Sequence, residues 1–210
     1  MTLSNISTGK VLAVMLSAIL SNVACAMESK TAINKSIPLT QSYVWYDGDR
    51  EQQVWLNPQV VAEFNPSPEG ESAMQGVSSS ARIVSTQHKQ AGIRLWRLDN
   101  TATAIHNIAT NYPQGKYSAV MHDAPTSTGR MRALPGNIIV YLNPQWDAAA
   151  VSNWLKTRKL EIVKKLEIGP NIYVIKTSPG MEALTTANTL YRSGEVKAAF
   201  PDWWQEVSPR

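Results

Sequence analysis

The sequence contains very few of the side chains that most often carry out chemistry. Cys25 is the only cysteine among 210 residues, and the histidines are limited to His88, His106 and His122. None of these histidines belongs to a zinc-binding helix motif, and no Gly-x-Ser-x-Gly turn, glycine-rich phosphate loop or convincing carboxylate pair is present. The sequence therefore argues against an enzyme, and we expect no catalytic residue, no metal and no cofactor.

Long apolar runs are also scarce. The one clear run, over residues 11–20, follows Lys10 and is too short to span a bilayer. Ala24-Cys25-Ala26 fits the small-residue cleavage rule, so we predict a signal peptide over residues 1–26 and a periplasmic or secreted protein with no membrane attachment after cleavage. The alternative is lipid modification of Cys25, which Asn22 disfavours because a large aliphatic residue is usual at that position. Cleavage would leave no cysteine, which excludes disulfides and thiol ligands.

Charge of either sign is low. Charged residues make up 17% of the chain and the formal net charge is +4, with no basic block of five or six residues, so a nucleic-acid partner is not expected. Asp47 and Asp49 flank a glycine, but the other positions of a calcium-binding loop are absent, which favours a plain turn.

Tryptophan, by contrast, is abundant, with seven against two phenylalanines, which indicates aromatic anchors. After a flexible lead over residues 27–40, the pattern predicts a β-hairpin with strands over 43–46 and 53–56. Asp47-Gly48 supplies the turn.

The last third of the chain shows the clearest pattern of strands and helices. Apolar runs predict strands over 138–142, 161–166, 172–175 and 196–200. A first helix is expected from the spacing of Ala148, Val151 and Leu155. A second helix is expected to open with Ser178 as N-cap and Pro179 at the first position, and to end at Gly194. One side of this helix is expected to be lined by Met181, Leu184, Ala187 and Tyr191. The order is β-α-β-β-α-β over residues 138–202, followed by an exposed, unpaired tail over 203–210.

This pattern recurs earlier in the chain. The run that starts at Ile93 precedes the run at Ile172 by 79 residues, and the same offset relates further pairs. These pairs are Ile83-Val84 with Ile162-Val163, Ile105 with Leu184, Tyr112 with Tyr191, Gly115 with Gly194, and Asp123 with Asp202. The run at Val60 precedes Ile138 by 78 residues. Duplication is favoured over coincidence.

The repeat predicts an α+β fold of two tandem ferredoxin-like β-α-β-β-α-β units, the first preceded by the hairpin. The hairpin and first unit would occupy residues 41–123, a linker 124–137 and the second unit 138–202. The first helix of the first unit is expected to be short, displaced or replaced by loop, because residues 67–80 contain several Gly and Pro. Arg130 and Arg132 are expected in an exposed, protease-sensitive loop of the linker.

The second unit resembles the N-terminal propeptide of subtilisin-family proteases, in particular the fervidolysin-like prodomain. The resemblance rests on the strand, Pro-containing turn and helix over 138–155, on the helix opened by Ser178-Pro179, and on the last strand and turn over 196–202. The hairpin, Tyr43-Val44-Trp45-Tyr46-Asp47-Gly48, resembles a segment of the same kind of protein. The resemblance implies an external chaperone and inhibitor of a separately encoded, secreted subtilisin-like serine protease.

The resemblance also implies how a protease would be bound. One sheet face would pack on two surface helices of the enzyme, and Asp202 would cap a helix N-terminus there. Residues 205–210 would lie in the cleft, with Arg210 in an acidic first pocket. The implied protease-binding residues are Asp202, Trp203, Trp204, Gln205, Glu206, Val207, Ser208, Pro209 and Arg210. Phe200 and Pro201 depart from the acidic residues often found beside the cap.

Other interpretations remain open. The tail could be an ordinary frayed terminus, and the two units could pack their spare sheet faces together. A pure protease inhibitor without chaperone activity would share the tail. A cell-wall or carbohydrate-binding module would use exposed tryptophans, here Trp45, Trp55, Trp96 and Trp146.

Overall fold

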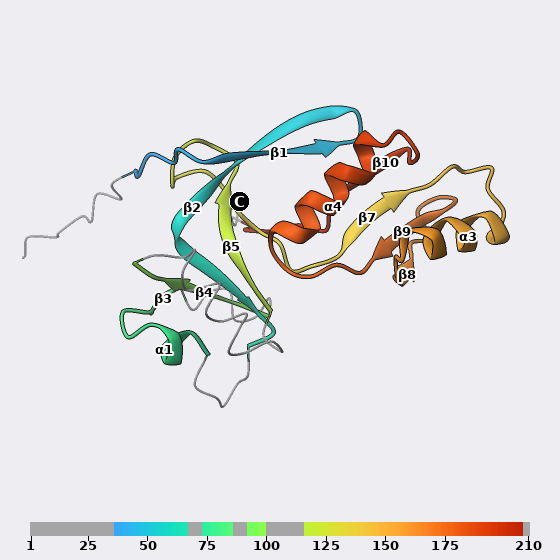
Figure 1. Cartoon of the computed structure of the whole chain (residues 1–210). Coiled ribbons are helices and arrows are strands. Elements are labelled where there is room, and N and C mark those ends of the chain that lie inside the picture. The colour runs from blue at the N-terminus through green and yellow to red at the C-terminus, as the bar shows by residue number, and fades with distance from the viewer. Residues whose placement is uncertain (1–35, 67–72, 86–91, 100–115, 208–210) are drawn as a thin grey trace, which may run out of the picture. The chain divides into compact units, whose positions relative to one another are not determined.

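The computed structural model describes residues 36–66, 73–85, 92–99 and 116–207 (Figure 1). The predicted α+β class is confirmed, since antiparallel strands dominate and few helices accompany them. The strands are β1 (Ser42–Asp47), β2 (Arg50–Phe64), β3 (Arg82–Ser85), β4 (Ile93–Arg97), β5 (Lys116–His122), β6 (Met131–Ala133), β7 (Ile138–Tyr141), β8 (Ile162–Lys165), β9 (Ile172–Ile175), β10 (Ala198–Pro201) and β11 (Trp204–Gln205). The helices are α1 (Ala73–Val77), α3 (Ala148–Arg158) and α4 (Met181–Arg192).

Several predictions concern residues outside this description. They are the signal peptide over 1–26, most of the lead over 27–40, the second helix of the first unit, and the tail residues Ser208, Pro209 and Arg210.

The small sheet contains β7 to β10 in the order β10-β7-β9-β8, and every neighbouring pair is antiparallel. α3 and α4 cover one face, because Val151, Trp154, Leu184 and Ala187 share a core cluster with the alternate strand residues. Those strand residues are Ile138, Val140, Tyr173, Ile175 and Ala199. Asp147 caps α3 by accepting a hydrogen bond from the backbone N–H of Ala150 at 2.7 Å, as expected of a short acidic side chain at an N-cap.

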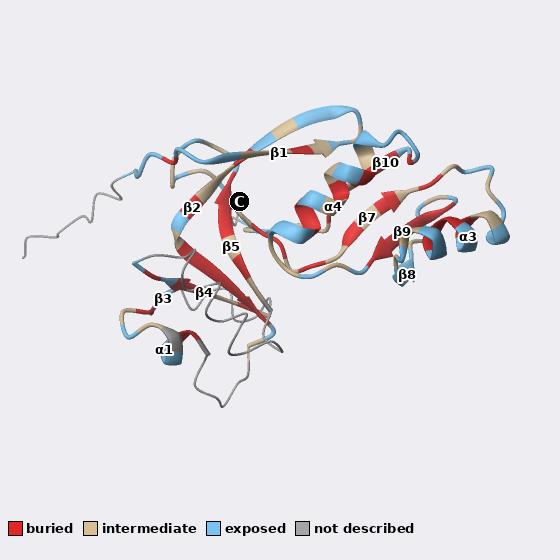
Figure 2. Ribbon diagram, in the orientation of Figure 1, coloured by how far each residue is buried: buried red, intermediate tan, exposed pale blue. Residues whose placement is uncertain are grey.

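α4 begins later than the sequence predicts. Its N-cap is Gly180 and not Ser178, so the prediction of a Ser-Pro opening is wrong. The reason is tertiary: the Gly180 N–H donates to the carbonyl of Leu134 at 2.9 Å, which holds this segment against the chain that precedes β7. The buried face also differs, since Met181 is exposed and Tyr191 is half-buried. Figure 2 shows that α4 carries both buried and exposed segments along its length. The buried residues are Ala183, Leu184, Ala187 and Leu190.

The predicted hairpin is present, but its second strand does not end where the sequence suggests. β1 pairs with β2 from Ser42 to Asp47, and the two-residue turn is Gly48-Asp49, with Gly48 at φ +63°. β2 is 15 residues long, so the second strand of the predicted hairpin and the strand predicted from Val60 onward form one continuous strand. Pro58 lies where the pairing of β2 with β5 shifts register, the kind of irregularity that tolerates proline inside a strand.

The large sheet has seven strands in the described part of the chain, in the order β11-β6-β5-β2-β4-β3, with β1 also on β2. Within it, β5-β2-β4-β3 repeats the order of the small sheet when each set is numbered along the chain. A register shift also occurs at the corresponding place in both sets, between Ile83 and Ser85 and between Ile162 and Lys164. α1 is a short helix, as the Gly and Pro content of that stretch predicts.

The pairing corrects the alignment of the two sets in detail. The sequence offsets match Val60 with Ile138 and Trp96 with Ile175. In the structure Ile138 pairs with Ile175, but Trp96 pairs with Val61 and not with Val60. Because Ala119 faces Val61 while Pro201 faces Ile138, the matching of Asp123 with Asp202 is wrong as well.

The stretch assigned to a linker, 124–137, contains strand β6, which pairs with β5 and β11. Arg132 lies in β6 and is half-buried, so the expectation of an exposed loop there is wrong. β6 has only three residues, Met131 to Ala133, inside a Pro- and Gly-rich stretch. So short a strand shows no periodic pattern in the sequence.

The hairpin packs on α4. Asn188 Nδ2 donates to the carbonyl of Val44 at 2.7 Å, and the rings of Tyr46 and Tyr191 stack with centroids 4.3 Å apart. Trp45 and Val54 consequently share the core of the small sheet. In the described part of the chain, no helix has the length and apolar character needed to cross a membrane.

Candidate protein-binding site

The face of the small sheet opposite to α3 and α4 carries two rows of apolar side chains. The pairing register places Phe200, Ile139 and Val174 in one row and Ala198, Tyr141 and Ile172 in the next. These six residues alternate with the helix-covered ones, as successive residues of a strand must. We call them the second face.

The second face is only partly withdrawn from solvent. Ile139, Tyr141 and Phe200 are half-buried, whereas Ile172, Val174 and Ala198 are buried. Phe200 also packs against the core cluster of the small sheet. The rings of Tyr141 and Phe200 meet edge to face with centroids 5.7 Å apart. The second face is therefore an aromatic and aliphatic surface, of the composition found at the centre of protein interfaces.

Asp202 lies at the border of the second face. Its backbone N–H donates to the carbonyl of Asn137 at 3.3 Å, which extends the pairing of β10 with β7 by one residue. Asp202 therefore has the strand parity of Phe200 and Ala198 and belongs to the same side of the sheet. Burial raises the pKa of its carboxyl group, and Lys164 opposes that rise in part. Burial thus disfavours the ionised form of Asp202 in the free protein. A partner that supplies positive potential would stabilise that ionised form.

The tail is not unpaired, and that prediction is wrong as far as Glu206. β11 pairs with β6 through Trp204 with Ala133 and Gln205 with Arg132. The Glu206 N–H donates to the carbonyl of Met131 at 2.9 Å. Val207 is 85% exposed, so the described chain leaves the sheet at this residue.

Trp203 and Trp204 are anchored within the protein itself. Trp204 packs against the core cluster of the large sheet. Trp203 packs against the core of the small sheet, and its ring meets Trp45 edge to face with centroids 5.7 Å apart. The tail thus ties the two sheets together near its start.

Arg132 closes this aromatic cluster. Its guanidinium carbon lies 5.4 Å from the ring centroid of Trp45 and 6.0 Å from that of Trp203, within the range of a cation–π attraction. Burial lowers the pKa of Arg132. Within the described residues, Nε of Arg132 and Nε1 of Trp203 are buried without a hydrogen-bond partner. The cluster therefore holds the tail but leaves polar atoms unsatisfied, which makes the attachment weaker than a fully bonded one.

The tryptophans proposed for carbohydrate binding have different environments. Trp45 and Trp96 are buried and unavailable to a ligand. Trp55 and Trp146 are half-buried, and of these Trp146 lines a cavity. Among the described residues, no group of three or more His, Cys, Asp or Glu is placed to hold a metal ion.

No local sequence pattern indicates that Arg132, Trp45 and Lys164 belong to this region. Arg132 and Trp45 meet Trp203 only through the pairing of β6 with β11 and the packing of the hairpin. The charge of Lys164 acts on the Asp202 carboxyl group from β8, at the opposite edge of the sheet from β10. No local pattern encodes any of these contacts.

Comparison with protein-family models, with curated proteins and with solved structures found no match to this chain.

Proposed function

We propose that this chain is an intermolecular chaperone and inhibitor of a secreted subtilisin-like serine protease. The observation that carries the proposal is the second face, an aromatic and aliphatic sheet surface bordered by Asp202. The sequence resemblance to subtilase propeptides implies docking through that kind of surface. Alternating strand residues that are apolar on both sides need either a core or a partner, and α3 and α4 occupy one side only.

The proposal includes two ferredoxin-like units in tandem, the first preceded by the hairpin. Support comes from the shared strand order, β5-β2-β4-β3 and β10-β7-β9-β8, and from the register shift at corresponding positions of β3 and β8. On this interpretation the second unit contacts the enzyme, and the hairpin stiffens it by packing on α4.

Asp202 would cap a helix of the enzyme. A helix N-terminus carries a partial positive charge and unbonded N–H groups, so a carboxylate placed there is stabilised. Because burial raises the pKa of Asp202 in the free protein, the complex would lower that pKa and gain affinity as pH rises through it.

The tail would provide inhibition. The resemblance implies that residues 205–210 lie extended in the cleft, with Arg210 in an acidic pocket. Since Trp204 and Gln205 pair with β6, binding would exchange this pairing for pairing with the enzyme. The exchange is feasible because the strand has only two residues and a main-chain partner replaces the lost bonds.

The chaperone activity follows from the same contacts. A preformed sheet that binds the native enzyme surface stabilises it by mass action. If it binds that surface in the transition state as well, folding accelerates, which matters for proteins dominated by non-local strand pairing.

The test measures inhibition of a panel of mature bacterial subtilisin-family proteases by the purified protein. We expect nanomolar to micromolar inhibition of at least one enzyme that prefers basic residues. Ile139→Asp, which places a charge at the centre of the second face, should weaken it about 100-fold or more. Ile168→Asp is the matched control, because Ile168 is 73% exposed and lies outside that face. Equal effects of both changes would reject docking through the second face.

A pure inhibitor is the nearest alternative, and it differs only in giving no gain when a denatured protease refolds. The proposed periplasmic or secreted location is tested separately by mass spectrometry of the mature protein, which should begin at Met27. A lipid adduct on Cys25 would contradict cleavage after Ala26.

A further inference from the structure

A second candidate site lies beside the small sheet, where the chain enters α3 and leaves α4. A cavity of about 400 Å³ is lined there by Trp146 and Tyr191 together with the polar residues Asn143, Glu195 and Lys197. Its volume is at the lower end of the roughly 300–1,000 Å³ of small-molecule sites. None of the residues that line this cavity is one of the six that form the second face, so the two sites are distinct.

The segments that carry the two aromatic side chains are held by contacts with other parts of the protein. Asn171 is buried, and its Nδ2 donates to the carbonyls of Asn143 at 2.9 Å and Trp146 at 2.8 Å. Tyr191 is stacked on Tyr46 of the hairpin. The ring of Trp146 also meets that of Trp154, with centroids 6.3 Å apart. These contacts restrain both aromatic side chains before any ligand binds, which reduces the entropy cost of binding.

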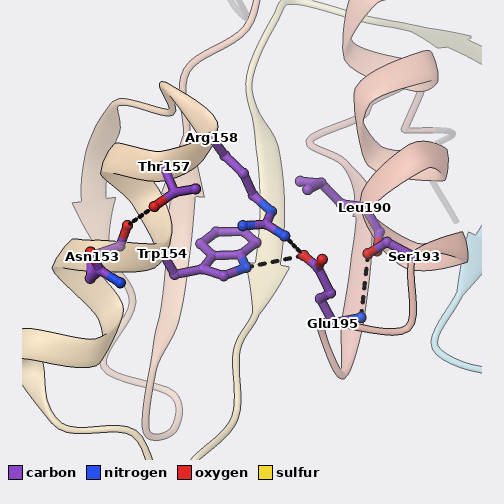
Figure 3. Close-up of polar contacts among 7 residues, drawn as sticks. All are labelled: Asn153, Trp154, Thr157, Arg158, Leu190, Ser193 and Glu195. Atoms are coloured by element: carbon purple, nitrogen blue, oxygen red, sulfur yellow. Dashed lines mark hydrogen bonds and ion pairs between the residues drawn. The ribbon is translucent and has the colours of Figure 1, made fainter.

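Glu195 is held by contacts of both its side chain and its backbone (Figure 3). Its Oε2 accepts a hydrogen bond from Nε1 of Trp154 at 3.3 Å and forms an ion pair with Arg158. Its backbone N–H donates to Oγ of Ser193, which in turn donates to the carbonyl of Leu190. Trp154 and Arg158 both belong to α3, whereas Glu195 lies in the loop that follows α4. The Glu195 carboxylate therefore links the two helices beside the cavity.

Beyond Glu195 lies a further hollow of about 320 Å³. It is lined by Leu160 and Leu190 and by hydroxyl-bearing residues of α4 and of its C-cap. Those hydroxyl residues are Thr185, Thr186, Thr189 and Ser193. Glu195 and its partner Arg158 border this hollow, and Glu195 borders the first cavity too. The surface therefore offers two adjoining subsites rather than an isolated pit.

We propose that these subsites bind a glycan chain, with one sugar ring against Trp146. The flat indole provides apolar area for the carbon–hydrogen face of a pyranose. Around it stand an acceptor-only carboxylate, a donor-only ammonium and an amide that does both, from Glu195, Lys197 and Asn143. Hydroxyl groups donate and accept, so a polyhydroxylated ligand satisfies this mixture, whereas a simple anion or cation satisfies part of it.

The experiment titrates the full mature chain with two soluble probes, chitotetraose and cellotetraose, and follows binding by calorimetry and tryptophan fluorescence. We expect saturable binding of at least one probe in the micromolar to millimolar range. Trp146→Ala should weaken it about tenfold or more, and Lys197→Ala severalfold. Trp55→Ala is the matched control, since Trp55 is also half-buried but lies in β2 away from the cavity; its affinity should equal that of the unmodified protein.

Lys197 is exposed, so Lys197→Ala keeps the fold even if Trp146→Ala does not. Absence of binding by both probes at millimolar concentration would overturn the proposal. So would binding that Lys197→Ala leaves unchanged, or binding that Trp55→Ala weakens as much as Trp146→Ala does. Because the cavity and the second face are separate, loss of glycan binding leaves protease inhibition intact, and the two proposals fail independently.

Discussion

Trp203→Ala should detach the tail from the protein, and its effect can be worked out from the contacts. Complete burial of a tryptophan makes truncation to alanine cost about 3–5 kcal/mol. Trp203 is half-buried and its Nε1 has no partner among the described residues, but it meets Trp45 edge to face and lies under Arg132. We therefore expect a loss of about 2 kcal/mol in the free energy of unfolding, intermediate between full burial and a single aromatic contact.

Urea unfolding measures this change. With a denaturant slope of about 2 kcal/mol per M, the midpoint should fall by about 1 M. Hydrogen exchange gives the local readout, because the Glu206 N–H that donates to Met131 should lose its protection once β11 leaves β6. Gln205→Ala is the matched control, since Gln205 lies in the same strand but is exposed, and it should change neither quantity.

The result that would refute this reasoning is an unchanged midpoint together with a protected Glu206 amide in Trp203→Ala. That outcome would show that main-chain pairing with β6 alone holds the tail. The same variant also bears on function, because a tail already released from β6 needs no exchange of partners and should inhibit the protease faster.

Two further predictions concern stability. Asp202→Asn should stabilise the protein at neutral pH: the raised pKa means that the folded state holds its proton to higher pH than the unfolded chain, so stability falls as pH rises from the ordinary value of 3.8 through the raised one. The gain should vanish below pH 3.8 in urea titrations across pH, and a constant gain would contradict it. Gly136→Ala should cost about 2–4 kcal/mol, because Gly136 has φ +96° and an added Cβ would lie 2.8 Å from the carbonyl oxygen of Thr177. Gly48→Ala, at φ +63° with open space around it, should cost only about 1 kcal/mol in the same thermal or urea assay, and equal losses would show that the contact with Thr177 is unimportant.

The elements that the sequence predicted well are those with a local signal. β7, β9 and α3 were found from apolar runs and helical spacing, because their burial repeats with the period of the element. α4 was found as well, but its start was misplaced because the bond from Gly180 to Leu134 overrides the Ser-Pro preference.

The fate of the tail could not be predicted in the same way. β11 has two residues and β6 has three, and they lie about 70 residues apart in the chain, so neither carries a periodic pattern. The tryptophans indicated burial, but only the pairing of Trp204 with Ala133 shows that the protein itself supplies the partner. Asp202 lies directly after the last strand of the small sheet, as predicted, whereas the influence of the Lys164 charge on its pKa depends on the strand order.

The central claim is tested most directly by refolding a denatured, mature-length subtilisin-family protease with and without this protein. The protease should be one that the protein inhibits in the panel described above, and its recovered activity should be measured after the added protein has been degraded. The account predicts a recovery at least several-fold higher with the unmodified protein, and no such gain with Ile139→Asp. Equal recovery with and without the protein would contradict the chaperone claim, and absence of inhibition across the panel would contradict protease binding itself.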